Sequence, residues 1–288
     1  MTVPPGGAVP PAGGRRIAVR LAYEGTRYSG WQVQPGRTTV QGTLAEAIRS
    51  ISGEDVLPHG ASRTDAGVHA LDQLAAFTTE GDLDADTWVR ALNARLPPDI
   101  TVREGCEVTA DFDPVAAAVR KRYRYRIHDA AWRPVLQRHL VWHWRGRLDC
   151  GRMREAAASL VGEHDFTSFE STPSTRRSKV RTIHTLTVVR PEVGDDAPGA
   201  EVWVEVEGNG FLYNMVRIIA GSLVMVGAGK RGPDWLGKAL AARSRPAAGP
   251  TAPPQGLVLV EIRVDTGDSV AGAADGGSWP KFPNNSAP

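Results

Sequence analysis

The sequence has few cysteines, little net charge and no long apolar run. Only two cysteines, Cys106 and Cys150, occur in 288 residues, and they form no CxxC pair. This usage is typical of a reduced interior, so we expect both to be buried packing residues rather than a redox pair. The most apolar stretch, residues 218–229, is too short to span a bilayer. These absences predict a soluble, cytoplasmic protein with no membrane partner.

The sequence also lacks the patterns that hold common cofactors and metals. Gly227–Lys230 resembles part of a phosphate-binding loop, but the glycine required earlier and the hydroxyl residue required next are missing. Gly208–Gly210 lacks the third glycine of a dinucleotide-binding loop. His139 and His143 have no nearby cysteine or acidic pair that would complete a zinc site. We therefore expect no metal and no cofactor.

The composition is that of a globular protein, with 41% hydrophobic and 23% charged residues. A chain of this length can form one large domain or two of ordinary size. Residues 1–14 and 266–288 are rich in Gly, Pro, Ser and Asn, so we expect flexible tails there. We place a domain boundary near residue 110. The predicted N-terminal domain covers residues 15–110 and the C-terminal domain residues 111–265.

Strand and helix patterns alternate between these tails. Their mixed order favours an α+β fold with a mixed, largely antiparallel central sheet flanked by helices. Thr43–Glu46 has the spacing of a capping box, which predicts that a helix begins there. The expected strands cover residues 16–23, 71–77, 120–128, 182–189, 201–207 and 257–265. The expected helices cover residues 43–52, 88–96, 149–161, 211–226 and 233–243.

The stretch Gly60–Ala70 combines small residues with one cation and one carboxylate. Its small side chains would let a ligand approach the backbone closely. Arg63 and Asp65 are separated by one residue, so in an extended segment their side chains point the same way. Either Asp65 bonds its own backbone in a turn, or it is a reactive carboxylate presented on a loop before a strand.

Two local clusters of positive charge stand out against a net charge of only +2. In residues 120–128 the arginines alternate with other residues, so they lie on one strand face and Tyr123 on the other. The arginine face is either solvated or salt-bridged, or it contacts RNA phosphates while the tyrosines stack on bases. The second cluster lies in residues 176–181, in a Ser- and Thr-rich stretch that we expect to be a loop. The candidate phosphate contacts are Arg120, Arg122, Arg124, Arg176, Arg177 and Lys179.

Arg217 lies in an otherwise apolar segment after Phe211–Val216. A cation in such surroundings needs a partner or an exit to water. It is either a structural arginine whose head group reaches solvent, or it pairs with a buried carboxylate and keeps that acid ionised.

Short motifs that occur in a fixed order along the chain carry a family resemblance. Any one of them is weak evidence, but the ordered series is specific. They are Tyr23–Thr26, Gly30–Gln32, Val40–Gly42, Arg63–His69, Tyr123–Tyr125, His164–Phe169, Gly208–Arg217, Thr251–Pro253 and Gly256–Leu257. From about residue 15 to residue 265 the chain resembles the tRNA pseudouridine synthase A family.

This resemblance implies a homodimer of two-domain α+β chains, with a catalytic cleft between the domains of each chain. The family converts uridines at positions 38–40 of the tRNA anticodon arm to pseudouridine without a cofactor. By motif, Asp65 would be the catalytic carboxylate. Arg63 would help to displace the target base, Tyr123 would stack on it, and Arg217 would pair with Asp65. Leu257 would line the base pocket.

The chain departs from the family pattern in two places. Val115-Ala116 stands where the family usually has Arg-Phe, and Asp72 stands where a glycine is common. Neither change removes Asp65, Arg63 or Tyr123. Two other functions stay open as alternatives: a non-catalytic RNA-binding protein on the same fold, and a metal-dependent nuclease, which would need clustered carboxylates.

Overall fold

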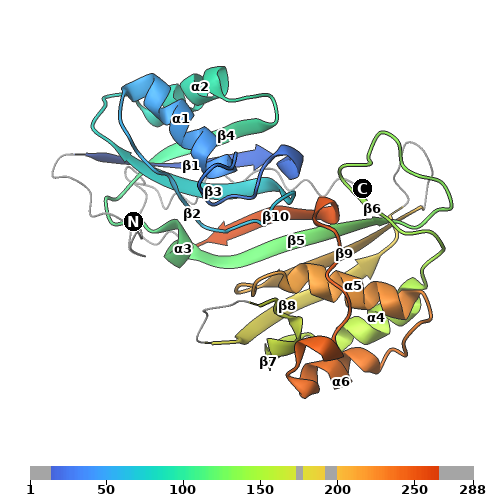
Figure 1. Ribbon diagram of the computed structural model, residues 1–288. Helices are drawn as coiled ribbons and strands as arrows, with labels where there is room; N and C mark the ends of the chain where they lie inside the picture. The colour runs from blue at the N-terminus through green and yellow to red at the C-terminus, as the bar shows by residue number, and fades with distance from the viewer. Residues whose placement is uncertain (1–13, 173–177, 192–199, 266–288) are drawn as a thin grey trace. The chain divides into compact units, whose positions relative to one another are not determined.

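The computed structural model describes residues 14–172, 178–191 and 200–265, which form two compact units. The first unit contains the chain up to Val119 and again from Ile262 onward, and the second contains Arg120–Glu261 (Figure 1). The chain therefore changes unit after residue 119, beyond the boundary that we placed near residue 110. The two expected tails lie outside the described residues, apart from Gly14.

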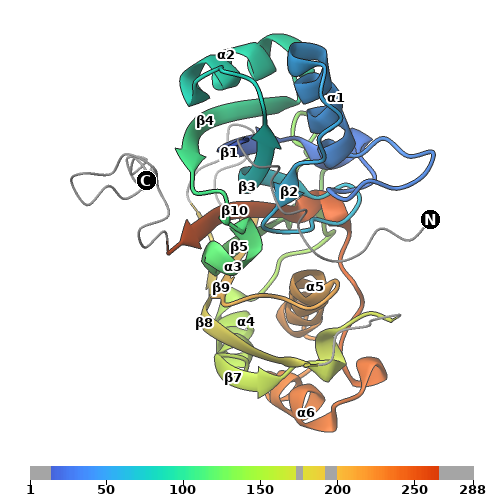
Figure 2. The same ribbon diagram turned by 90° about the vertical axis from the view of Figure 1, so that its left-hand side faces the viewer.

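The first unit is built on an antiparallel sheet with the strand order β4-β1-β3. The short strand β2 pairs with β3. Helices α1 and α2 lie together on one side of these strands (Figure 2). The elements are β1 (Arg15–Tyr23), a 3-10 turn η1 (Gly25–Arg27), α1 (Val40–Ser52), β2 (His59–Gly60), β3 (His69–Thr79), α2 (Ala85–Arg95), β4 (Ile100–Val108) and α3 (Pro114–Ala117).

The core of the first unit follows the apolar pattern of β1. Ile17, Val19 and Leu21 are fully buried, as their alternation predicts. Arg20 is buried as well, and its guanidinium lies 2.5 Å from the carboxylate of Asp72. The Arg20 guanidinium also donates to Ile262 O at 3.0 Å, while Ile262 N donates to Asp72 at 2.9 Å. The departure at Asp72 therefore forms a paired structural carboxylate within this unit.

The second unit is built on an antiparallel sheet with the order β5-β9-β8-β7, and the short strand β6 pairs with β5 in parallel. Helix α4 packs against β8 and against both other helices. The last strand, β10, crosses from the second unit into the first. The elements are β5 (Ala118–His128), β6 (Trp142–His143), α4 (Cys150–Ala158), β7 (Gly162–Asp165), η2 (Thr167–Phe169), β8 (Val180–Val189), β9 (Glu201–Gly208), α5 (Met215–Gly227), α6 (Trp235–Ala242), η3 (Arg245–Ala247), η4 (Pro254–Gly256) and β10 (Leu257–Val264).

The α+β prediction with a largely antiparallel sheet is confirmed, but three helix starts were wrong by three or four residues. Helix α2 begins at Ala85 rather than at residue 88, because Asp84 is its N-cap and accepts from Thr87 N. Helix α1 begins at Val40 because Thr39 is its N-cap and accepts a hydrogen bond from Gly42 N. The hydroxyl of Thr43 instead donates to Thr39 O, so no capping box forms at Thr43. Helix α5 begins at Met215 rather than at residue 211, because Asn214 has a left-handed backbone with φ of 61°. Across the described residues, no helix combines the length and apolar character needed to cross a membrane.

A buried carboxylate ties together the ends of two strands in the second unit. Asp129 follows β5, and its side chain is fully buried. It accepts both arms of the Arg190 guanidinium, at 2.8 and 2.7 Å, and the backbone N–H of Leu148 at 2.9 Å. Arg190 follows β8, and hydrogen bonding to Asp129 raises the pKa of its guanidinium. Two-armed pairing of this kind offsets the cost of removing both charges from water.

We predict that Asp129→Ala lowers the free energy of unfolding by about 3 to 5 kcal/mol, because it removes the buried carboxylate that balances the charge of the partly buried Arg190. Urea denaturation followed by circular dichroism measures the change. Asp234→Ala is the matched control, because Asp234 forms an exposed i,i+4 pair with Lys238; the free energy of unfolding should change far less in this variant. Equal losses in the two variants would contradict the assignment.

Both cysteines are free and half-buried rather than fully buried as expected. Cys106 lies in β4, and burial, reinforced by the nearby charge of Glu104, raises the pKa of its thiol to about 12. Since the thiolate is the reactive species, a thiol with this pKa is almost entirely unreactive near neutral pH.

We expect iodoacetamide to modify Cys106 of the folded protein slowly at pH 8. The rate should rise about tenfold for each pH unit between pH 8 and pH 10, because the pKa lies above this range. Peptide mass spectrometry gives the rate for this cysteine alone. Protein unfolded in urea is the control, since there the thiol pKa returns to about 8.5 and alkylation should become fast. Fast alkylation of the folded protein at pH 8 would show that the thiol is not protected by burial.

Candidate active site

Asp65 lies on the loop that joins β2 to β3 in the first unit. Val68 N donates to Asp65 O at 3.1 Å, which closes a four-residue turn. Gly67 is the third residue of this turn and has φ of +76°, a value that glycine adopts without strain. The turn directs the chain into β3, where His69 begins the strand.

The burial of the side chains alternates along this loop. Ser62 and Thr64 are buried, whereas Arg63 is exposed and Asp65 is half-buried. The expectation that Arg63 and Asp65 point the same way agrees with this alternation. Thr64 is fixed from within the unit, because its hydroxyl lies 2.7 Å from the hydroxyl of Tyr23. The exposed Arg63 and the half-buried Asp65 thus alternate with buried residues that hold the loop in place.

Ser62 is fixed through its backbone by a buried glutamine of β3. Gln73 accepts from Ser62 N at 3.2 Å, and its amide donates to Ser62 O at 2.5 Å. Gln73 is fully buried, so these bonds are shielded from water. The side-chain amide therefore extends the sheet pairing toward Asp65, starting from the bond between Ala61 N and Leu74 O.

A second loop, residues 24–31, packs against the backbone of the Asp65 loop. We call it the supporting loop. Trp31 N donates to Thr64 O at 3.0 Å, and Gly67 N donates to Tyr28 O at 3.2 Å. Gly25 N donates to Nδ1 of His69 at 2.9 Å. These bonds hold the backbone on both sides of the half-buried Asp65.

Glycine allows the two backbones to approach this closely. A Cβ atom at Gly25 would lie 2.0 Å from Val68 O, and one at Gly30 would lie 2.6 Å from Thr64 O. Gly30 also has φ of +89°, in the left-handed region. The glycines of the Tyr23–Thr26 and Gly30–Gln32 motifs are therefore required by this contact.

The predicted stacking residue, Tyr123, lies on β5 in the second unit and is buried. Its ring meets the ring of Phe211 edge-on, with centroids 5.3 Å apart and an interplanar angle of 89°. This contact fixes the orientation of the Tyr123 ring.

Arg217 lies in the first turn of α5, also in the second unit. Its Nε donates to Ala252 O and its Nη1 to Asn214 Oδ1, both at 2.8 Å. Ala252 N donates back to Arg217 O at 3.1 Å. Arg217 therefore fixes the segment that leads to β10, whose first residue, Leu257, is buried.

Tyr125 supports the same segment from β5. Its hydroxyl donates to Pro253 O at 2.7 Å. A Cβ atom at Gly256 would lie 2.7 Å from the Tyr125 ring, so only glycine fits beneath it. Burial raises the pKa of the Tyr125 phenol well above its ordinary value, which keeps the hydroxyl protonated as a donor.

The arginine face of β5 is salt-bridged, one of the two arrangements that the sequence left open. Arg124 pairs with Glu205 at 2.6 Å, and its guanidinium lies 4.0 Å from the ring centre of Trp203. The other pairs are Arg120 with Glu207, Arg122 with Glu261 and Arg126 with Glu201. These partners neutralise much of the positive charge of the face. Lys179 pairs with Glu170, whereas Arg176 and Arg177 lie outside the described residues.

Among the described residues, no group of three or more His, Cys, Asp and Glu side chains could hold a metal ion. His143 Nε2 lies 3.0 Å from Ala130 O, so this histidine contacts a backbone oxygen. The nuclease alternative needs clustered carboxylates, and the described part of the chain offers none.

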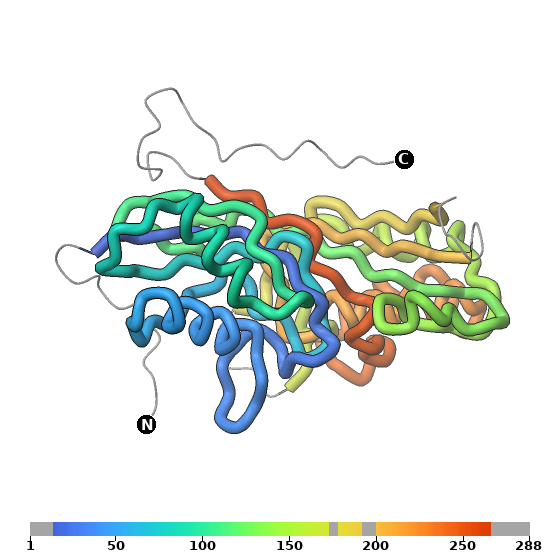
Figure 3. The backbone as a smooth tube through the Cα atoms, turned by 90° about the horizontal axis from the view of Figure 1, so that it is seen from above, coloured from blue at the N-terminus to red at the C-terminus, as the bar shows by residue number. Residues whose placement is uncertain are grey.

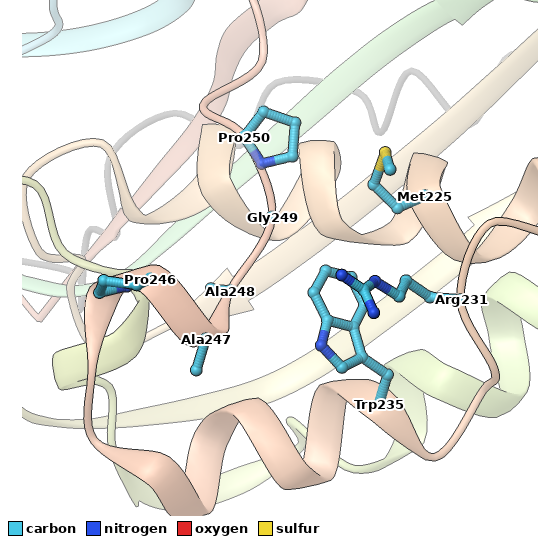
Figure 4. Close-up of a pocket in the computed structure, with 8 residues that line it drawn as sticks. All are labelled: Met225, Arg231, Trp235, Pro246, Ala247, Ala248, Gly249 and Pro250. Carbon is cyan, nitrogen blue, oxygen red and sulfur yellow. The ribbon is translucent and has the colours of Figure 1, made fainter.

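A cavity of about 330 Å³ lies in the second unit between α5, α6 and the segment after α6 (Figure 4). Its one charged lining residue is Arg231, whose guanidinium lies 5.1 Å from the ring centre of Trp235. The lining contains no carboxylate and none of the predicted site residues. We assign no chemistry to this cavity.

The structure thus places Arg63 and Asp65 in the first unit, and Tyr123, Arg217 and Leu257 in the second. The sequence analysis missed two contacts of the supporting loop: Tyr28 O accepts from Gly67 N at 3.2 Å, and Asp99 O accepts from Glu24 N at 2.9 Å. The glycines of residues 24–31 were a signal for the first, whereas nothing in the local pattern indicated the second.

Comparisons with known proteins agree with the sequence resemblance. The family model described as "tRNA pseudouridine synthase" matches residues 20–115 and 156–265. Proteins named tRNA pseudouridine synthase A from Geotalea uraniireducens and Brevibacillus brevis are 45% and 46% identical over 248 residues. Each match covers 86% of this chain and 99% of the relative. The corresponding protein of Myxococcus xanthus is 44% identical over 86% of this chain and 91% of its own length.

The similarity to solved structures is weak. The chain of the archaeal box H/ACA sRNP Nop10–Cbf5 complex gives a TM-score of 0.34 and 13% identity, and covers 73% of this chain and 44% of its own length. The assignment therefore rests on the family model and the sequence relatives. On this evidence the chain belongs to the tRNA pseudouridine synthase family.

Proposed function

We propose that this isomerase converts uridines at positions 38–40 in the anticodon arm of tRNA to pseudouridine, with Asp65 as the catalytic carboxylate. One observation supports the assignment of Asp65 above all. Its side chain is half-buried, and so partly accessible, on a loop whose neighbouring residues are held by hydrogen bonds on both sides. A reactive group needs this combination of access and fixed position.

The reaction itself explains why few special groups are required. The N1–C1′ glycosidic bond breaks, the uracil turns, and C5 bonds to C1′. C5 loses a hydrogen and N1 gains one, so there is no net oxidation or reduction and no group donor. An ionised carboxylate beside the sugar and base can act as nucleophile or base in such a sequence. Asp65 is the residue that we assign to this step.

The other proposed site residues serve the base that leaves the helix. Displacing a base from its stack costs about a few kcal/mol, which cation and aromatic contacts offset. Arg63 is exposed and lies two residues before Asp65. Its cation is suited to help displace the target base. We propose that Tyr123 stacks on the target base and that Leu257 lines its pocket. We further propose that Arg217 pairs with Asp65 in the working enzyme, since an adjacent cation keeps a carboxylate ionised.

We propose that tRNA phosphates are bound by basic residues from the two sequence clusters. Arg120, Arg122 and Arg124 already have glutamate partners, so an RNA phosphate would have to share or displace them. Lys179 is likewise paired with Glu170. Arg176 and Arg177 complete the proposed set from sequence alone. The resemblance also supports a cytoplasmic homodimer.

The direct test uses unmodified tRNA transcript, purified protein and no added metal or cofactor, followed by pseudouridine mapping. We expect modification confined to positions 38–40 of the anticodon arm. Pseudouridine at another site would keep the reaction and contradict the substrate assignment. Binding without any pseudouridine would favour the non-catalytic RNA-binding alternative.

We predict that Asp65→Asn abolishes turnover and leaves tRNA affinity within about twofold, because it removes the reactive carboxylate but keeps the size of the side chain. Tritium release from tRNA labelled at uridine C5 measures turnover, since C5 loses its hydrogen. Filter binding measures affinity.

Asp55→Asn is the matched control for this test, because Asp55 is an exposed carboxylate of the same unit that pairs with Arg49. It should keep full activity. If Asp65→Asn released tritium at the wild-type rate, Asp65 could not be the catalytic carboxylate.

A further inference from the structure

The supporting loop is bound to α1 through the carbonyls of Gly30 and Trp31, and at its other end it is anchored to Asp99. This residue lies in the short connection between α2 and β4 (Figure 3). Helix α2 ends at Arg95, and β4 begins at Ile100, whose N–H donates to Pro97 O at 3.0 Å. Asp99 is thus held between two regular elements. Neither the motifs nor the proposed chemistry assigns it a role.

Asp99 contacts the supporting loop with both its backbone and its carboxylate. Asp99 O accepts from Glu24 N at 2.9 Å. One carboxylate oxygen accepts from the Tyr28 hydroxyl at 2.8 Å, and the other accepts from Arg27 Nε at 2.7 Å. The Asp99 side chain is only 13% exposed. A carboxylate shielded to this extent forms stronger hydrogen bonds than one in open water.

Tyr28 connects this anchor to the turn that carries Asp65. Its ring is buried, its hydroxyl donates to Asp99, and its backbone oxygen accepts from Gly67 N. The connection from Asp99 to the turn at Asp65 therefore runs through one buried residue. Burial, together with the bond to Asp99, raises the pKa of the Tyr28 phenol to about 12, so the hydroxyl remains a donor at every pH used for assay.

We propose that Asp99 is a positioning residue for Asp65, acting through Tyr28 and the backbone of the supporting loop. This inference rests on the proposed role of Asp65. Asp99 touches no reacting atom; it fixes the distance between the Asp65 turn and the rigid α2–β4 connection. Loss of the anchor would widen the range of positions that the catalytic carboxylate samples, and small displacements of a reacting group cost rate steeply.

A purely structural role of Asp99 would affect the stability of the protein and not the rate of the reaction. Asp99 could simply stabilise the 24–31 segment, which would lower the melting temperature without changing the reaction. Arg27 contributes to such a role, but its side chain is 64% exposed, so its pair with Asp99 is largely screened. The buried bond from Tyr28 is the one that reaches the turn. The test must therefore separate the rate of the reaction from the stability of the protein.

The experiment compares Asp99→Ala, Tyr28→Phe and the double variant as full-length proteins, using tritium release from tRNA labelled at uridine C5. We expect each single variant to lower kcat about tenfold, with KM for tRNA unchanged within about twofold. The double variant should be no slower than Asp99→Ala, because both changes break the same connection. Arg27→Gln is the matched control and should stay within about twofold of wild type, since it removes the screened contact only.

A second measurement does not depend on activity. Native-state hydrogen exchange reports the amides of Trp31 and Gly67, which donate to the Asp65 loop and to Tyr28 respectively. Both should exchange at least about tenfold faster in Asp99→Ala and in Tyr28→Phe, because local opening becomes easier. The amides of β1 serve as the internal reference and should stay unchanged.

The possible outcomes separate the two proposals. Unchanged kcat in both single variants, or unchanged exchange at Trp31 and Gly67, would overturn the positioning role. A fall in melting temperature with unchanged kcat would show that Asp99 is only structural. If wild-type protein releases no tritium, the proposed function fails; faster exchange at the two amides would then still show that Asp99 anchors the loop.

Discussion

The candidate site depends on the contact between two backbones, the supporting loop and the loop that carries Asp65. The contact is made of hydrogen bonds between main-chain groups, and it exists only because Gly25 and Gly30 have no side chain to separate the two segments. Main-chain bonds of this kind fix the position of the loop without using the side chain of Asp65. Two side-chain contacts hold the same loop: the Thr64 hydroxyl contacts the hydroxyl of Tyr23, and Gln73 accepts from Ser62 N. The position of the Asp65 loop is thus set by main-chain groups and by Thr64 and Gln73.

Charge is distributed differently in the two units. In the first, the exposed Arg63 cation and the half-buried Asp65 carboxylate are separated by one residue in the sequence. In the second, each arginine on the exposed face of β5 has a glutamate within ion-pair distance. Paired charges of this kind give a weak field at long range, which agrees with the net charge of only +2. Recognition of a polyanion by this chain would therefore depend on close contact more than on long-range attraction.

The sequence predicted the features that have a period and missed those that depend on distant partners. Alternation correctly predicted that Ile17, Val19 and Leu21 of β1 are buried. The start of α1 was wrong because Thr39 and Thr43 are both plausible caps, and only the three-dimensional context of Gly30 and Trp31, whose carbonyls accept from Val40 and Gln41, decides between them. Asp99 escaped notice because a carboxylate after two prolines is typical of an ordinary turn. Its role comes from Tyr28, which is distant in the sequence.

The first unit is not continuous in sequence, and this has a consequence for its synthesis. Ile262 bonds both Asp72 and Arg20, and the first of these bonds spans 190 residues. During translation the N-terminal strands leave the ribosome long before Ile262 does, so Arg20 and Asp72 can pair with each other well before either can bond to Ile262. The unit that carries Asp65 can reach its final packing only after Ile262 has been made. A nascent chain that ends before Ile262 would therefore lack the final packing of the unit that carries Asp65, even if it contained most of the second unit.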